Sequence, residues 1–173
     1  MRHLYLVRHG HTEMNEAGRF SGQTETHLTA RGREQAQEAG KQAKALQLDL
    51  IVSSPLSRAH DTARIIAEEI GYPEYAIKLD NLLMERHFGS AEGVVYSREF
   101  DMESIADAEK LESLRSRLEQ LWNKLQDTPA ENILIVGHGS AGRMLRHVVL
   151  PHIPFHGTSE AHHLPNAEII QLL

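Results

Sequence analysis

The stretch Leu4-Tyr5-Leu6-Val7-Arg8-His9-Gly10-His11-Thr12 decides the fold. Its apolar first half is typical of a strand that is buried on both faces, and this run stops at an arginine, a histidine and a glycine. In open α/β sheets, ligands bind outside the carboxyl ends of the strands. Arg8 and His9 are therefore expected where an anion can bind, and Gly10 lets the chain turn tightly beside them.

Two further apolar runs end in the same way. Leu48–Val52 leads into Ser53-Ser54-Pro55-Leu56-Ser57-Arg58, and Ile133–Val136 leads into Gly137-His138-Gly139. If the three runs form parallel strands of one sheet, they deliver two arginines and two histidines to a single edge.

Apolar residues at helical spacing predict four helices between these strands. Thr29 is the expected N-cap of the first helix, Ser53 or Ser54 of the second and Ser104 of the third, and the fourth begins at Ser140. Arg58 then lies in the first turn of its helix, where unpaired amides and the positive end of the helix dipole favour an anion.

Two further strands complete the expected sheet. Residues 76–79 predict a short strand, and residues 167–173 predict a final strand at an edge. Alternating strands and helices favour an α/β fold, a three-layer α/β/α sandwich with a mostly parallel central sheet. With 173 residues, the chain fits a single domain over residues 1–173.

Composition excludes several classes of protein. A net charge of −6, from 24 acidic and 18 basic residues, argues against a nucleic-acid binder. No cysteine is present, so a disulfide, a thiolate metal site and a catalytic thiol are all excluded. No apolar run is long enough for a membrane span or a signal peptide, and a cytoplasmic location without membrane contact is the default expectation.

The predicted edge suits a phosphoryl group. The planar guanidinium of arginine matches phosphate oxygens in paired hydrogen bonds, and phosphoryl transfer depends mostly on positioning and charge stabilisation. A neutral imidazole can act as the nucleophile when a hydrogen bond fixes its tautomer, a role that His9 fits better than His138. Glu85, within Leu82–Gly89, is the best candidate for the proton donor.

The sequence resembles the histidine phosphatase superfamily, in particular its phosphoglycerate-mutase-like branch. The resemblance covers nearly the whole chain and rests on blocks that match in order and spacing. These blocks are Arg8–Thr12, Arg19–Gly22 with Leu28–Gly32, Ser53–Ala59 with Thr62, Glu85–Gly89, and Gly137–Gly139.

The resemblance implies a role for each matched residue. His9 would be the phosphorylated nucleophile, with Arg8, Arg58 and His138 holding the phosphoryl oxygens. Glu85 would protonate the leaving oxygen and then activate water. No metal or cofactor is implied, and the implied partner is a small-molecule phosphate ester. The residues that align with phosphate or substrate contacts are Asn15, Ser21, Gly22 and Gly139.

Some positions depart from the family pattern. His11 stands where an acidic residue is common, Glu25 and His27 replace an aspartate and a proline, and Phe88 stands where mutases tend to have tyrosine. The mutases also have a longer insertion with basic residues for the substrate carboxylate, whereas residues 86–103 contain only Arg86 and Arg98 as arginine or lysine. A short lid admits water, which favours hydrolysis over mutase turnover.

Other functions remain open at the level of sequence. A phosphoglycerate mutase, a protein phosphohistidine phosphatase and a non-catalytic phosphate-binding module are the alternatives on the same fold. The presence of Glu85 argues against the last two. A metal site would need histidines from those at 9, 11, 87, 152, 156, 162 and 163, but their spacing matches no zinc signature. His156, His162 and His163 are expected to be solvated in a loop.

Overall fold

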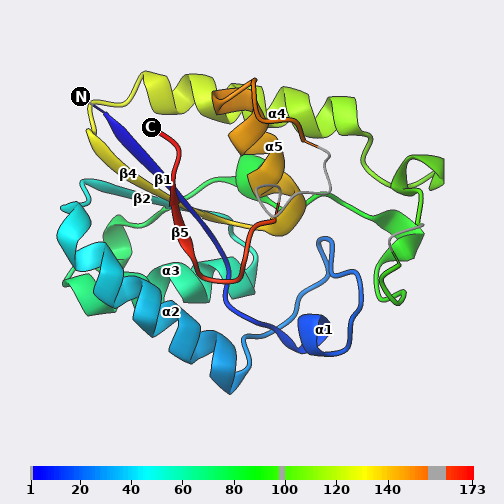
Figure 1. Cartoon of the computed structure of the whole chain (residues 1–173), viewed down its shortest axis with the longest axis horizontal. Coiled ribbons are helices and arrows are strands. Elements are labelled where there is room, and N and C mark those ends of the chain that lie inside the picture. Colours follow the sequence, from blue (N-terminus) through cyan, green and yellow to red (C-terminus); the bar gives the residue numbers. More distant parts are fainter. Residues whose placement is uncertain (1, 98–99, 156–162) are drawn as a thin grey trace.

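A five-stranded sheet forms the middle layer of the computed structural model, which describes residues 2–97, 100–155 and 163–173 (Figure 1). The strand order is β3-β2-β4-β1-β5. β5 runs antiparallel to β1, and the other pairings are parallel. The predicted α/β fold with a mostly parallel sheet is therefore confirmed. The strands are β1 (His3–Arg8), β2 (Leu50–Ser53), β3 (Lys78–Leu79), β4 (Asn132–Gly137) and β5 (Ile169–Gln171).

Helices cover both faces of the sheet. α2 (Ala30–Ala43) and α3 (Ser57–Ile70) pack on one face, and α4 (Leu111–Gln126) and α5 (Gly139–Val149) pack on the other (Figure 1). Among the described residues, no helix has both the length and the apolar character needed to cross a membrane. The short elements are α1 (Glu13–Glu16) and the 3-10 turns Lys44–Leu46, Glu74–Ala76, Asn81–Leu83, Gly89–Ala91 and Met102–Ser104.

Alternating side chains of β1 divide the core into two halves. Leu4 and Leu6 pack with α4 and α5, whereas Tyr5 and Val7 pack with α2 and α3, as the two-residue period of a strand requires. Both faces of β1 are thus buried, as predicted from its apolar run.

The register brings the strand ends to one edge. Arg8 pairs with Gly137, and Ser53 pairs with Val136. His9, Ser54 and His138 therefore follow directly after three neighbouring strands at the carboxyl edge of the sheet.

The predicted start of the long helix at Ser104 is wrong, because α4 begins at Leu111 with Lys110 as its N-cap. The Ser104 hydroxyl donates to the Asp101 carbonyl instead of capping a helix. Arg86 donates from Nε to the Glu109 carbonyl at 2.7 Å and also pairs with Glu103. These contacts hold the segment before α4 against residues distant in sequence, and they override its helical pattern.

The expected serine cap of α3 is also wrong. Ser53 belongs to β2, and the N-cap position is Leu56, which makes no side-chain cap bond. The Glu25 carboxylate caps the helix from another loop. It accepts from the Ser57 backbone N–H at 3.1 Å and from the Ser57 hydroxyl. Arg58 nevertheless lies in the first turn of the helix, as predicted.

The remaining boundaries differ by a few residues. β2 begins at Leu50 instead of Leu48, because the Asp49 carboxylate accepts backbone N–H bonds from Glu131 and Asn132 in the neighbouring loop. The edge position of the last strand is confirmed by β5.

Candidate active site

Five predicted site residues converge at the carboxyl edge of β1, β2 and β4. His9 follows β1, Arg58 lies in the first turn of α3, and His138 precedes α5. Arg8 ends β1, and Glu85 reaches the same place from the irregular segment after β3. The structure thus brings together side chains from four separate parts of the chain.

The His9 ring is held in one tautomer. Its Nδ1 lies 2.8 Å from the Gly10 carbonyl oxygen, which can only accept, so Nδ1 carries the proton. Its Nε2 accepts from Arg58 Nε at 3.3 Å. Burial first, and then the positive charges of Arg8 and Arg58, lower the pKa of His9 well below 6.5. His9 is therefore a neutral imidazole with a lone pair on Nε2, and 3% of the residue stays exposed.

Arg58 is completely buried and fixed by backbone carbonyls. Its Nη2 donates to Gly22 at 2.6 Å and its Nη1 donates to Thr24 at 3.1 Å. Burial lowers the pKa of this guanidinium, while the carboxylates of Glu85, Glu25 and Glu92 raise it. The group stays charged and directs Nε at the His9 ring.

Arg8 is less completely bonded. Its Nη1 donates to the Leu164 carbonyl at 3.1 Å, while its buried Nε has no partner among the described residues. Burial lowers the pKa of Arg8, and the Glu85 charge opposes this effect. Arg8 therefore has a donor left for an incoming anion.

His138 lies edge-on to His9, with the ring centroids 5.3 Å apart at 60°. Its Nε2 lies 2.7 Å from Ser54 Oγ, and that oxygen also accepts from the Leu56 backbone N–H at 3.3 Å. When Ser54 donates its own proton to Nε2, the imidazole carries its proton on Nδ1, which has no partner in the described part of the chain. Burial and the Arg58 charge lower the pKa of His138 well below 6.5.

Glu85 caps α5 from outside the helix. Its carboxylate accepts from the backbone N–H groups of Ser140 at 3.0 Å, Ala141 at 2.8 Å and Arg86 at 2.9 Å. A Cβ placed on Gly139 would lie 3.6 Å from Glu85 Oε2 and 3.7 Å from Arg8 Cζ. The carboxylate and the guanidinium thus flank the first residue of α5.

The other predicted contact residues are placed less directly. Asn15 forms a reciprocal capping box with Thr12 at the start of α1. Gly22 offers its carbonyl to Arg58, and its backbone has φ +52°. Ser21 is half-buried, and its carbonyl accepts from the Thr24 backbone N–H at 3.0 Å. Of these three residues, Gly22 is the one that contacts an arginine of the site, through its bond from Arg58.

Three supporting residues of the site were not predicted from the sequence. Ser54 orients His138, although it was expected to cap a helix. The Thr62 hydroxyl accepts from the Gly10 backbone N–H at 3.0 Å and donates to the Arg58 carbonyl at 2.7 Å. Asn166 Nδ2 donates to the His9 carbonyl at 2.8 Å. Ser54 and Thr62 lie within the quoted blocks, but no local signal marks Asn166.

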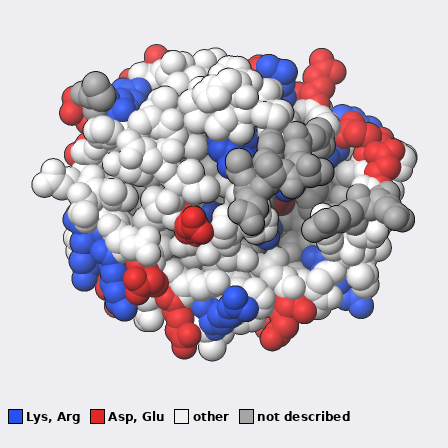
Figure 2. Space-filling model, viewed as in Figure 1, with Lys and Arg blue, Asp and Glu red and all other residues white. Residues whose placement is uncertain are grey.

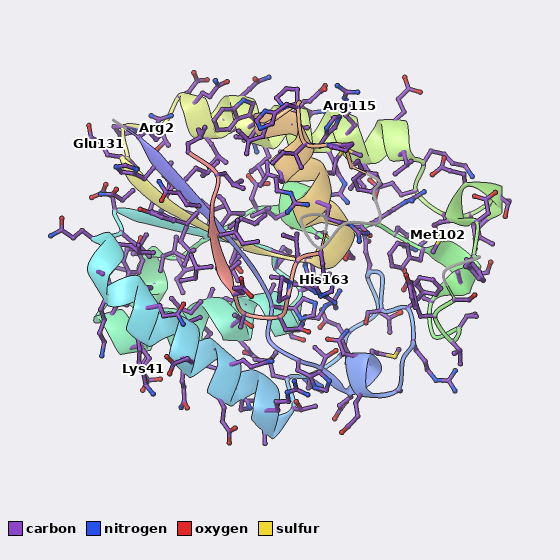
Figure 3. All side chains as sticks on the ribbon, viewed as in Figure 1. Arg2, Lys41, Met102, Arg115, Glu131 and His163 are labelled. Atoms are coloured by element: carbon purple, nitrogen blue, oxygen red, sulfur yellow. The ribbon has the colours of Figure 1, made fainter. Side chains whose placement is uncertain are left out.

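Of the three predicted loop histidines, one belongs to the described residues. His163 is exposed (Figure 3), whereas His156 and His162 lie outside the described residues. Within the described ranges, no three side chains of histidine, aspartate or glutamate form a group that could hold a metal ion.

Comparisons with known proteins agree with this geometry. The model of the histidine phosphatase superfamily (branch 1) matches residues 4–173. The chain is 37% identical over 145 residues to an uncharacterized phosphatase, PhoE, of Bacillus subtilis, which covers 82% of the chain and 74% of that protein. It is 32% identical over 162 residues to a 2,3-bisphosphoglycerate-dependent phosphoglycerate mutase of Parvibaculum lavamentivorans, with 82% and 77% covered.

Solved structures show the same similarity over nearly the whole chain. A mycobacterial glucosyl-3-phosphoglycerate phosphatase in complex with VO3 has a TM-score of 0.82 at 26% identity, covering 99% of this chain and 92% of that one. A phosphoserine phosphatase of Entamoeba histolytica in complex with phosphoserine has a TM-score of 0.80 at 28% identity, covering 99% and 90%.

Proposed function

The chain belongs to branch 1 of the histidine phosphatase superfamily, and from this premise we propose that it hydrolyses small phosphomonoesters through a phosphohistidine on His9. Phosphatase relatives support phosphatase activity. The observation that carries the proposal is the His9 ring, with Nδ1–H held by a carbonyl and Nε2 facing Arg58.

The first step transfers the phosphoryl group to the protein. The Nε2 lone pair of His9 attacks phosphorus while the bond to the ester oxygen breaks. Arg8, Arg58 and the Nδ1–H of His138 donate to the phosphoryl oxygens and stabilise the charge that spreads over them. Glu85, acting as the general acid, gives a proton to the leaving alkoxide.

The second step returns the protein to its starting state. The Glu85 carboxylate takes a proton from water, the water oxygen attacks phosphorus, and the bond between phosphorus and Nε2 breaks. The products are inorganic phosphate, a neutral His9 and a Glu85 that carries its proton again. No metal takes part in this scheme, because cationic side chains stabilise the phosphoryl oxygens.

Hydrolysis is favoured over mutase turnover by the contacts of Arg86. This side chain pairs with Glu103 and donates to the Glu109 carbonyl, so it is not available for a substrate carboxylate. The relatives named as mutases therefore provide an alternative activity, but nothing in the segment 86–97 favours it.

Trapping the intermediate tests the proposal. Rapid quenching during hydrolysis of p-nitrophenyl phosphate is expected to yield a phosphoprotein that is labile in acid and stable in base, as a phosphoramidate is. His9→Ala is expected to remove this species and to lower kcat at least about 1,000-fold. The control is His152→Asn, which replaces an exposed histidine. Full activity of His9→Ala would refute the proposal.

A further inference from the structure

Buried arginine atoms without partners extend beyond the catalytic residues. The described residues contain five buried side-chain polar atoms that make no hydrogen bond, and three of them are arginine Nε atoms. They belong to Arg8, Arg143 and Arg146. Because buried polar groups are normally bonded, three such donors call for a partner that is not a described part of the chain.

These arginines form a row that begins at the phosphoryl site. Gly139, Arg143 and Arg146 lie four and three residues apart, so they share one face of α5. Helical side chains lean toward the N-terminus, and Arg143 does so, since its Nη2 lies 3.3 Å from Ser140 Oγ. Arg8 meets the same face at Gly139. Figure 2 shows basic side chains at the surface over α5.

Glu85 acts on Arg8 at the start of the row, but Arg143 and Arg146 form no ion pair with a carboxylate within the described ranges. Other partly buried arginines of the chain have such partners: Arg86 pairs with Glu103, and Arg117 pairs with Glu109. Arg143 is also close enough to Arg8 and Arg146 to lower the pKa of both guanidinium groups. Adjacent like charges without counter-charges destabilise the fold, and a bound anion would offset this effect.

The Arg143 guanidinium is also supported from one side. Its Cζ lies 5.6 Å from the ring centroid of Phe155, in a cation–π arrangement. The ring restricts the orientation of the guanidinium, while Nε stays unbonded within the described part of the molecule. An oriented planar guanidinium suits recognition of a carboxylate or a phosphoryl group.

We propose that Arg143 binds a second anionic group of the substrate, so that the preferred substrates are phosphomonoesters that also carry a carboxylate or a second phosphoryl group. This inference rests on the proposed function. Arg143 lies about 6 Å along the helix axis from Gly139, so the two anionic groups must be a few bonds apart. Arg146, one turn further, adds positive potential behind Arg143.

Two matched esters test this specificity. 3-Phosphoglycerate and glycerol 3-phosphate differ only in a carboxylate or a hydroxymethyl group on the same carbon. The wild type is expected to favour 3-phosphoglycerate in kcat/KM. Arg143→Gln is expected to lower that preference by roughly 10- to 100-fold, mainly through KM, because it removes a charge-assisted hydrogen bond. Arg143→Lys keeps the charge but loses the planar guanidinium, and its preference is expected to lie between those of the wild type and Arg143→Gln.

A charge-matched control separates local recognition from net charge. Arg115→Gln removes the same charge from an exposed side chain on α4 (Figure 3) and is expected to leave the preference unchanged. An equal loss for both esters in Arg143→Gln, an equal effect of Arg115→Gln, or a wild type that prefers glycerol 3-phosphate would each refute the anion site. Circular dichroism confirms that the variants fold, and if Arg143→Gln does not fold, Arg143→Lys decides the question by the same ratio.

Binding without turnover keeps this inference separate from the proposed function. Calorimetry on His9→Ala protein is expected to show tighter binding of 3-phosphoglycerate than of glycerol 3-phosphate, and Arg143→Gln in that background is expected to remove the difference. Loss of phosphohistidine with this difference intact would refute the catalytic scheme alone. Active enzyme with no difference would refute the anion site alone.

Discussion

His9 and His138 show how burial selects a protonation state at the scale of single residues. Both rings are almost fully buried next to guanidinium groups, and the pKa of each lies well below 6.5 because of desolvation and neighbouring positive charge. The folded protein therefore keeps both imidazoles neutral at pH values where the unfolded chain protonates them. Stability and the proposed catalysis consequently depend on the same two groups.

The free energy of unfolding is expected to rise with pH between about 5 and 6.5. In this window the unfolded chain binds protons at both imidazoles and the folded chain does not. The stability that the neutral imidazoles contribute is therefore complete above the pKa of the unfolded chain and is lost as the pH falls. Each ring adds up to about 1.4 kcal/mol per pH unit. Urea unfolding at several pH values measures the slope.

Two histidine variants check this assignment. His9→Gln is expected to reduce the slope of the unfolding free energy against pH by the contribution of about one proton. The exposed His152→Gln is expected to leave this slope unchanged. An identical slope in wild type and His9→Gln would show that the low pKa of His9 does not control the acid side of stability.

Glu85→Gln is expected to lower kcat by about 100-fold or more for alkyl phosphates, because an amide cannot protonate the leaving alkoxide. The loss for p-nitrophenyl phosphate is expected to be much smaller, since its leaving group needs little protonation. Steady-state kinetics on both esters measure the difference, with the exposed Glu112→Gln as control. Equal losses on both esters would remove Glu85 from the acid role.

At the scale of elements, α3 depends on a cap that comes from another segment. The Glu25 carboxylate accepts from the Ser57 backbone N–H at 3.1 Å, and the next residue is Arg58, which contacts His9. A negative group at a helix N-terminus stabilises the helix through its free amides and dipole. Local sequence could not predict this cap, because nothing near Leu56 supplies it.

Glu25→Ala is expected to reduce the free energy of unfolding by about 1 kcal/mol and to lower kcat/KM, since the first turn of α3 carries Arg58. Glu38→Ala is the control, because Glu38 forms an exposed pair with Lys41 on α2 (Figure 3), and such pairs contribute little. Thermal unfolding and hydrolysis of p-nitrophenyl phosphate measure both effects. A loss no larger than that of Glu38→Ala would contradict the capping role.

The difference between local sequence signals and contacts from distant segments explains which elements the sequence predicted. β1, β2 and β4 were predicted because buried parallel strands leave continuous apolar runs. The start of α4 was predicted too early, because Arg86 donates to the Glu109 carbonyl across a loop, while Arg117 of α4 bonds to the Glu109 carboxylate. Tertiary contacts of this kind override local pattern and leave no periodic signal.

At the scale of the whole molecule, an acidic protein builds a local cationic site. The net charge is −6, yet Arg8, Arg58, Arg143 and Arg146 gather around one edge of the sheet and the adjoining face of α5. The quoted blocks predicted Arg8 and Arg58, because they lie next to strand ends. Arg143 and Arg146 were not predicted, since only the fold shows that their face of α5 is continuous with Gly139.

Hydrolysis of phosphate esters is expected to persist after treatment with a chelator, because guanidinium and imidazole groups supply the charge stabilisation that a metal supplies elsewhere. The measurement compares kcat before and after dialysis against EDTA, and after addition of magnesium or zinc. Activity that disappears with EDTA and returns with one metal would contradict this prediction.

The bond from Asn166 to the His9 carbonyl joins residues that are 157 positions apart. During translation, His9, the proposed nucleophile, leaves the ribosome long before the side chain that anchors its backbone has been made. A nascent polypeptide can therefore display the opening loop without a competent catalyst. Turnover is expected to begin only after residue 166 has emerged.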